Sequence, residues 1–248
     1  MFDSDLSSAD ATPSPFHAMR SHDTAATMGK IPFDVVLFDL DGTLADTAAD
    51  LTAALNHSLE QLGRSPLSVN EVRRMVGHGA RTLLRRGLSA TGAVTEDLVE
   101  QAFPLFIDYY KVHIADHTRP FEGVDVALAA LDDQGVRLAI CTNKPEALTH
   151  KLIAALGWEG RFDAIVGGDT VPQRKPDPAP VHEAIARAGG GRAAFVGDSI
   201  SDTDAARAAG IPCIALTFGF SDRPADQLRA TALVDHYDQL LPALERLG

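Results

Sequence analysis

Two aspartates stand two positions apart where an apolar run ends, in the stretch FDLDGTLADT at residues 38–47. Because residues i and i+2 of a strand face the same side, Asp39 and Asp41 can serve one site. In open α/β sheets, such sites lie beyond the carboxyl ends of the strands. The alternative is a plain turn, in which both acids cap a reversal and Gly42 supplies the unusual backbone angles. This motif alone supports the turn and the site equally.

Polar groups of the kinds that phosphoryl chemistry needs also follow later apolar runs. Thr142 and Asn143 follow the run VRLAIC, where a hydroxyl and an amide can donate to a phosphate oxygen. Lys175, in RKPDP, can neutralise a carboxylate nucleophile and phosphoryl oxygens. Asp198 and Asp202 lie in VGDSISD, after a further run. Each group has an ordinary alternative, which is a helix N-cap at Thr142, a solvated lysine, or a capping box completed by Asp202.

These ordinary alternatives are independent of one another. If the chain has no phosphoryl-transfer site, every one of these polar groups must have its ordinary structural role at the same time. The carboxyl ends of parallel strands meet at one edge of a sheet, and the polar groups stand at successive strand ends. Their repeated placement therefore favours one shared site for phosphoryl chemistry over a series of unrelated turns and caps.

The elements that position these groups can be predicted from the pattern of apolar residues. Short runs rich in Val, Ile, Leu and Phe alternate with segments whose apolar residues have helical spacing. This alternation predicts an α/β fold with a doubly wound parallel sheet. We expect the strands at residues 33–40, 136–142, 162–168, 193–198 and 212–218.

The interval between the first two strands is far longer than one crossover helix requires. Its helical pattern predicts an inserted α-helical cap over residues 46–116, and an α/β catalytic core of residues 31–45 and 117–248. Residues 1–30 are rich in Ser, Thr, Asp and Ala and lack the apolar centre of a signal peptide. We therefore expect a disordered tail there, with Met28 as an alternative start.

The composition argues against several classes of partner. A formal net charge of -12 over 248 residues is unfavourable for a general nucleic-acid or anionic-membrane binder. No apolar run approaches the ~20 residues that span a bilayer. Cys141 and Cys213 each lie within an apolar run, which indicates unpaired core cysteines and a reducing cytoplasm rather than a disulfide framework.

Taken together, the motifs resemble those of the haloacid dehalogenase superfamily of phosphohydrolases, over essentially residues 33–240. The chain has them in the same order, with a helical insert after the first. The motifs are DLDGT at residues 39–43, Thr142, Lys175, and GDS at residues 197–199 with Asp202.

The resemblance implies a mechanism through an aspartyl-phosphate. Asp39 would be the nucleophile, and Asp41 would be the general acid and then the general base. Thr142 and Lys175 would hold the transferring phosphoryl oxygens, which is the electrostatic stabilisation expected to dominate this chemistry. Further substrate contacts would come from Thr43 and Asn143.

The resemblance also implies Mg²⁺ as the cofactor, because this ion suits a site of oxygen ligands. Its ligands would be a carboxylate oxygen of Asp39, the backbone carbonyl of Asp41 and the carboxylate of Asp198. Asp202 would orient the metal's ligand shell or Lys175.

One stretch of the expected cap bears on the substrate. EVRRMVGHGARTLLRRG, at residues 71–87, contains five arginines and one glutamate, and its glycines can present backbone N–H groups to an anion. A solvated basic helix face is the alternative. With ADTAADL before it and RPFEGV after the cap, the stretch resembles the phosphoglycolate phosphatase branch. That resemblance implies substrate contacts from Gly77, His78, Gly79 and Arg81.

Two other classes of function share parts of this pattern. A phosphatase or mutase that acts on a sugar phosphate keeps both acids of the first motif. Receiver domains of signalling proteins also place Asp, Thr and Lys around Mg²⁺, but they are shorter and have no cap. We expect a small-molecule phosphate monoester as the partner, no nucleic acid and no membrane, and a monomer or a homodimer.

Overall fold

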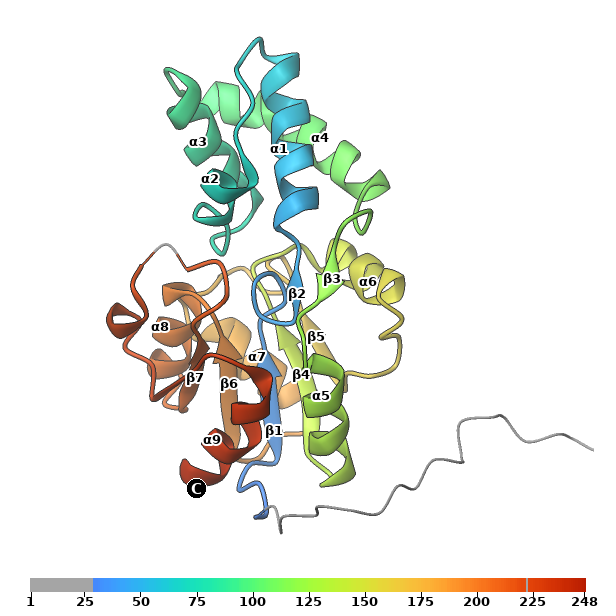
Figure 1. Ribbon diagram of the computed structural model, residues 1–248, viewed down its shortest axis with the longest axis vertical. Coiled ribbons are helices and arrows are strands. Elements are labelled where there is room, and N and C mark those ends of the chain that lie inside the picture. Colours follow the sequence, from blue (N-terminus) through green and yellow to red (C-terminus); the bar gives the residue numbers. More distant parts are fainter. Residues whose placement is uncertain (1–28, 222) are drawn as a thin grey trace, which may run out of the picture.

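The computed structural model describes residues 29–221 and 223–248, which form an α/β sheet with a group of helices above it (Figure 1). Nearly all of the tail expected at residues 1–30 lies outside the described residues. Among the described residues, no helix has both the length and the apolar character to cross a membrane.

The sheet has six parallel strands in the order β5-β4-β1-β6-β7-β8. The expected doubly wound α/β fold is confirmed, and all five expected strands are present. The sixth, at the edge of the sheet, was not expected, because its three residues give no distinct apolar run. The strands are β1 (Val35–Phe38), β4 (Arg137–Cys141), β5 (Ala164–Val166), β6 (Ala193–Gly197), β7 (Cys213–Leu216) and β8 (Ala232–Val234).

Helices cover both faces of this sheet. Side chains alternate along each strand, so Val36 packs under α5, α6 and α9 while Val35 packs under α7 and α8. Cys141 and Cys213 lie on the second face, buried and without a disulfide, as expected. The elements are α5 (Val124–Asp133), α6 (Glu146–Ala155), α7 (Ala179–Arg187), α8 (Ile200–Ala208) and α9 (Leu240–Arg246), with 3₁₀ turns η1 (Ala225–Gln227) and η2 (Tyr237–Gln239).

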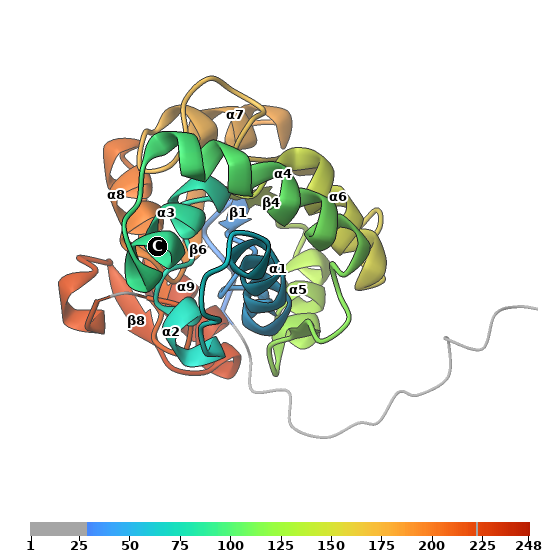
Figure 2. The same cartoon turned by 90° about the horizontal axis from the view of Figure 1, so that it is seen from above.

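Four further helices lie over the carboxyl end of the sheet, as Figure 1 and Figure 2 show from two directions. A short antiparallel ribbon of β2 (Ala45–Asp46) and β3 (Arg119–Pro120) joins them to the sheet. We propose that residues 46–116 are a cap on a core of residues 31–45 and 117–248. The helices of this cap are α1 (Ala48–Gln61), α2 (Val69–Arg73), α3 (Ala80–Thr91) and α4 (Glu96–Val112).

A buried carboxylate fastens the base of the cap. Asp50 lies in the first turn of α1 and is 1% exposed. Its Oδ2 accepts hydrogen bonds from the backbone N–H of Thr118 at 2.8 Å and from the hydroxyl of Thr118 at 2.6 Å. The backbone N–H of His117 donates to its Oδ1 at 3.1 Å. These bonds tie the start of α1 to the segment that returns to the core.

We expect Asp50→Ala to lower the free energy of unfolding by about 3 kcal/mol, because it leaves buried donors without an acceptor. Urea unfolding followed by circular dichroism measures this change. The matched control is Asp108→Ala on α4, whose side chain is 79% exposed, and we expect a change within about 0.5 kcal/mol. Equal losses in the two variants would contradict the role of Asp50 as a clamp.

Candidate active site

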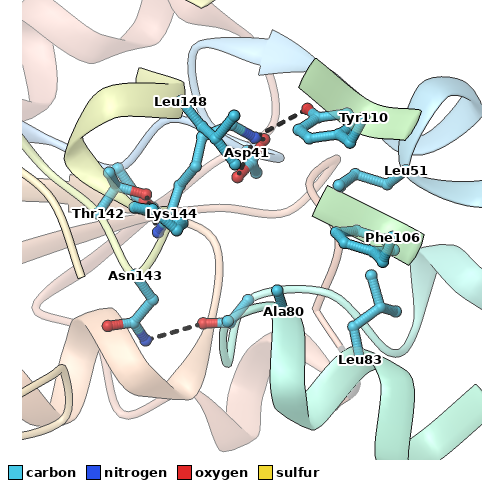
Figure 3. A pocket seen from close by; sticks show the side chains of 14 residues that line it. Asp41, Leu51, Ala80, Leu83, Phe106, Tyr110, Thr142, Asn143, Lys144 and Leu148 are labelled. Atoms are coloured by element: carbon cyan, nitrogen blue, oxygen red, sulfur yellow. Dashed lines mark hydrogen bonds and ion pairs between the residues drawn. The ribbon is translucent and has the colours of Figure 1, made fainter. Parts of the chain in front are cut away.

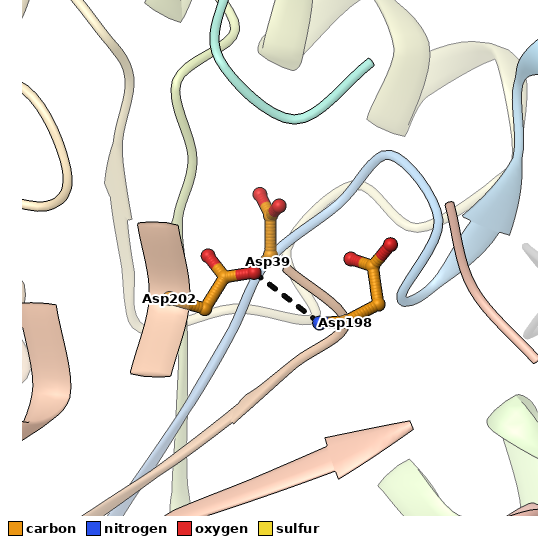
Figure 4. A group of neighbouring side chains, drawn as sticks. All are labelled: Asp39, Asp198 and Asp202. Atoms are coloured by element: carbon orange, nitrogen blue, oxygen red, sulfur yellow. Dashed lines mark hydrogen bonds between the residues drawn. The ribbon is translucent and has the colours of Figure 1, made fainter. Parts of the chain in front are cut away.

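Three aspartates converge at the carboxyl edge of the sheet, and Figure 4 shows their side chains together. Asp39 follows β1, and its backbone N–H donates to the carbonyl of Val196 on β6 at 3.0 Å. Asp198 follows β6, and Asp202 lies in the first turn of α8. Each acid offers a carboxylate oxygen within 4.8 Å of those of the others, and all three are buried. Acids that stand at two strand ends in the sequence thus meet in one place.

Lys175 lies inside this cluster. Its ammonium donates to Asp202 Oδ1 at 2.6 Å and to the carbonyl of Cys141 at 2.6 Å, and it lies 3.2 Å from Asp39 Oδ1. The side chain is fully buried. Burial alone would lower the pKa of Lys175, but the carboxylates of Asp202 and Asp39 outweigh burial and hold that pKa above its usual value. Lys175 therefore stays charged beside Asp39.

Asp202 is both a structural and a site residue. Its Oδ2 accepts hydrogen bonds from the backbone N–H and the hydroxyl of Ser199, at 2.9 and 2.7 Å, and the first of these bonds belongs to the capping box at the start of α8. Its Oδ1 accepts from Lys175. The capping box that the sequence offered as an alternative therefore exists together with the acidic site.

Asp198 is held on both carboxylate oxygens. Its Oδ1 accepts from the hydroxyl of Thr43 at 2.8 Å, and its Oδ2 accepts from the backbone N–H of Phe220 at 2.6 Å. Gly42 has a φ of +85°, and a Cβ there would collide with the Asp198 carboxylate. The first motif thus needs glycine for its backbone angle and for this close approach.

The acidic cluster carries more negative than positive charge. Burial raises the pKa of Asp39 to about 6, although Lys175 opposes the shift. Burial, together with the neighbouring Asp202 and Asp39, raises the pKa of Asp198 well above its usual value. When all three carboxylates are ionised, they exceed the one ammonium of Lys175 by two negative charges. A divalent cation with oxygen ligands fits this donor set, because it would neutralise that excess.

Asp41 is held by Lys144, which in turn bonds to Tyr110, and the sequence analysis missed both of these residues. The ammonium of Lys144 donates to Asp41 Oδ1 and Oδ2 at 2.7 and 3.0 Å, and to the hydroxyl of Tyr110 at 2.8 Å. Lys144 follows directly after Asn143, so its place at a strand end was a usable signal. Tyr110 lies on α4 of the cap and gave no such signal.

Thr142 and Asn143 follow β4 at the same edge of the sheet. The hydroxyl of Thr142 accepts from the backbone N–H of Lys144 at 3.2 Å, and the N-cap of α6 is Pro145 rather than Thr142. The amide of Asn143 donates to the carbonyls of Gly77 and Lys175, both at 3.1 Å. Its Oδ1 is buried and has no hydrogen-bond partner among the described residues.

A cavity of about 40 Å³ opens between these core residues and the cap (Figure 3). Its wall on the core side includes Asp39, Asp41 and Thr142. On the cap side, Gly77 and Gly79 line it, and Gly79 is the N-cap of α3. The space admits about three waters, which limits an enclosed ligand to a small molecule.

The other two expected cap contacts lie elsewhere. His78 Nδ1 lies 2.9 Å from the hydroxyl of Ser201 on α8, so it joins the cap to the core. Arg81 is not among the residues that line the cavity, and its guanidinium pairs with Glu100 at 2.7 Å and stacks on Phe103. The count of charges over residues 71–87 did not include this partner, because Glu100 belongs to α4.

Comparison with known proteins gives a consistent result. The profile of the family described as haloacid dehalogenase-like hydrolase matches residues 36–216. The phosphoglycolate phosphatase of Mesorhizobium japonicum is 44% identical over 218 residues, which cover 86% of this chain and 96% of that protein. The phosphoglycolate phosphatase of Caulobacter vibrioides is 43% identical, over 82% of this chain and 86% of that protein.

A similar structure supports the same assignment. The crystal structure of a predicted phosphoglycolate phosphatase from Haemophilus somnus has a TM-score of 0.79 and 31% identity. It covers 85% of this chain and 97% of its own chain. The family match spans the acidic cluster and Lys175. The chain therefore belongs to the haloacid dehalogenase-like hydrolases.

Proposed function

We propose that this protein hydrolyses 2-phosphoglycolate to glycolate and phosphate, with Mg²⁺ as cofactor and an aspartyl-phosphate on Asp39 as intermediate. The observation that carries the proposal is the arrangement of Asp39 and Asp41 in the wall of a small cavity, with Lys175 directly behind Asp39. The relatives named phosphoglycolate phosphatase, at 44% and 43% identity, support the choice of substrate. We further propose that the enzyme works in the cytoplasm, as a monomer or a homodimer.

Asp39 would attack the phosphorus, so that a bond forms to its carboxylate oxygen while the bond to the glycolate oxygen breaks. Asp41 would give a proton to the departing oxygen, and would then take a proton from the water that attacks the aspartyl-phosphate. Lys175, at 3.2 Å from Asp39, would offset the repulsion between this carboxylate and the phosphate. The hydroxyl of Thr142 would hold a phosphoryl oxygen.

The residues that would hold Mg²⁺ are Asp39, Asp198 and the backbone carbonyl of Asp41. When bound, the ion supplies the positive charge that lets a phosphate dianion approach a buried carboxylate. Asp202 would act behind these ligands, since the ammonium of Lys175 already pairs with its charge at 2.6 Å. Thr43 would support the metal site through its bond to Asp198 rather than contact the substrate.

Of the four cap contacts expected from the sequence, Gly77 and Gly79 are the best placed to meet the substrate, because both line the cavity. The start of α3 at Gly79 presents backbone N–H groups, which favour an anion. Asn143 would act mainly through its bond to the carbonyl of Gly77, which holds the cap against the core. His78 would do the same through Ser201.

We expect Asp39→Asn to reduce phosphate release from 2-phosphoglycolate by at least about 10³-fold, because an amide cannot form the covalent intermediate. A phosphate assay with Mg²⁺ measures turnover, and circular dichroism checks that the fold is kept. Asp132→Asn, an exposed change on α5, is the matched control and should retain wild-type turnover.

The same assay tests the proposed substrate against hexose phosphates. If the wild-type protein releases no phosphate from any monoester, the phosphatase assignment is wrong. Preference for a hexose phosphate, or isomerisation without release, would overturn only the choice of 2-phosphoglycolate. Near-normal turnover by Asp39→Asn would exclude Asp39 as the nucleophile.

Metal binding has a separate readout in thermal unfolding. Saturating Mg²⁺ should raise the melting temperature of the wild-type protein by about 5 °C, because the ion binds the folded state alone. In Asp198→Asn we expect this rise to disappear, whatever the starting stability of the variant. The control Asp204→Asn, at a half-buried residue of α8 that pairs with Arg207, should keep it. An unchanged rise in Asp198→Asn would remove Asp198 from the metal site.

A further inference from the structure

The cavity has one cationic side chain in its wall. Among the described residues that line it, Lys144 alone carries a positive charge, and its side chain is 4% exposed. Lys175 lies behind Asp39, where its ammonium bonds to Asp202, and it is not one of the lining residues. A substrate with two anionic groups would therefore meet one ammonium near the phosphoryl end and Lys144 at the other end.

The cap arginines do not compete for this role. Arg81 pairs with Glu100 at 2.7 Å, and Arg85 pairs with Glu96 at 2.6 Å. Neither arginine lines the cavity. Each would have to give up a carboxylate partner and change direction to reach a ligand there.

Lys144 and Tyr110 together form a pair of donors. Lys144 donates to both carboxylate oxygens of Asp41 and to the phenol oxygen of Tyr110. Because the phenol accepts from Lys144, its own proton can be donated to another group. An ammonium from the core and a hydroxyl from α4, which lie 2.8 Å apart, match the two oxygens of a carboxylate.

The distances fit a short substrate. Asp41 must lie within hydrogen-bond reach of the ester oxygen to transfer a proton to it. Lys144 lies 2.7 Å from Asp41, so its ammonium is within about 6 Å of that ester oxygen, the sum of two hydrogen bonds. In 2-phosphoglycolate one methylene separates the ester oxygen from the carboxylate, which brings the carboxylate within reach of Lys144.

We propose that Lys144, assisted by the hydroxyl of Tyr110, binds the carboxylate of the substrate and selects phosphate esters that carry this second anion. This inference rests on the proposed function, because it assigns the non-phosphoryl end of the same cavity. Lys144 then bonds both to Asp41 and to the substrate carboxylate, while Asp41 keeps its own contact with the ester oxygen. The second position of charge, rather than the size of the cavity alone, distinguishes 2-phosphoglycolate from a phosphate ester of equal length that lacks the carboxylate.

The test compares 2-phosphoglycolate with ethyl phosphate, which has a methyl group in place of the carboxylate. The quantity measured is the ratio of the two kcat/KM values. Lys144→Met should lower this ratio by about 100-fold, mainly through a higher KM for 2-phosphoglycolate, since the carboxylate is bound equally before and during the reaction. Tyr110→Phe, which removes one oxygen atom, should lower it by about 10-fold.

Lys111→Met is the matched control, because it removes a lysine charge one position from Tyr110 on the exposed side of α4. It should leave the ratio within about twofold. Any of three results would overturn the proposal. They are a wild-type ratio near one, an equal loss of kcat/KM on both substrates in Lys144→Met, and a collapse of the ratio in Arg81→Gln instead. Those outcomes leave the phosphatase assignment standing, whereas no phosphate release from any ester overturns the assignment itself. If Lys144→Met does not fold, an unchanged ratio in Tyr110→Phe overturns the proposal.

Discussion

The structure depends on keeping three carboxylates and one ammonium together out of contact with water. Lys175 is fully buried and bonds to Asp202 while it lies beside Asp39, so its charge is what makes the acidic cluster tolerable. Breaking a buried pair by removing one partner typically costs about 3–5 kcal/mol, because the remaining charge is uncompensated. The excess of negative charge that Lys175 leaves is the feature that makes a divalent cation a chemically reasonable occupant. Stability and chemistry therefore make opposite demands on this cluster. Folding would be favoured most by full neutralisation of the carboxylates, whereas the proposed function needs an excess of negative charge that a cation can neutralise.

The site uses structural hydrogen bonds to fix groups that have chemical roles. Asp202 caps α8 through Ser199 with one oxygen and holds Lys175 with the other. The helix α8, which starts just after β6, thus positions the ammonium of Lys175, which lies on a loop distant in the sequence. A capping box and an active-site contact are therefore not competing explanations of the same aspartate. A sequence pattern that suits one can serve both, because a carboxylate has two oxygens and four acceptor sites.

The sequence could predict those parts of the site that follow from strand ends. Parallel strands bring their carboxyl ends to one edge, so Asp39 and Asp198 had to lie near each other once both strands were recognised. The pairing of Lys144 with Tyr110 could not be predicted in this way, because it joins the core to a helix of the cap. The partner of Arg81 was missed for a related reason, since local charge counts ignore side chains on a neighbouring helix. The edge strand β8 was missed because three residues are too few to show a period.

The contacts between cap and core explain how a closed cavity can still admit a substrate. Asn143 bonds to the carbonyl of Gly77, and the hydroxyl of Ser201 lies against His78, so these bonds would be exchanged for bonds to water if the cap opened. Such exchanges cost only about 0.5–1.5 kcal/mol each, because water replaces the lost partner. Asp50 is different, since it lies at the base of the cap and its bonds need not break when the far end moves. The cap is thus attached at its base by bonds that can stay intact, whereas opening would break the contacts at the cavity, including the bond from Lys144 to Tyr110. A ligand that bonds to both sides at once, to Lys144 on the core and to Tyr110 on α4, would add its own binding energy to the closed state.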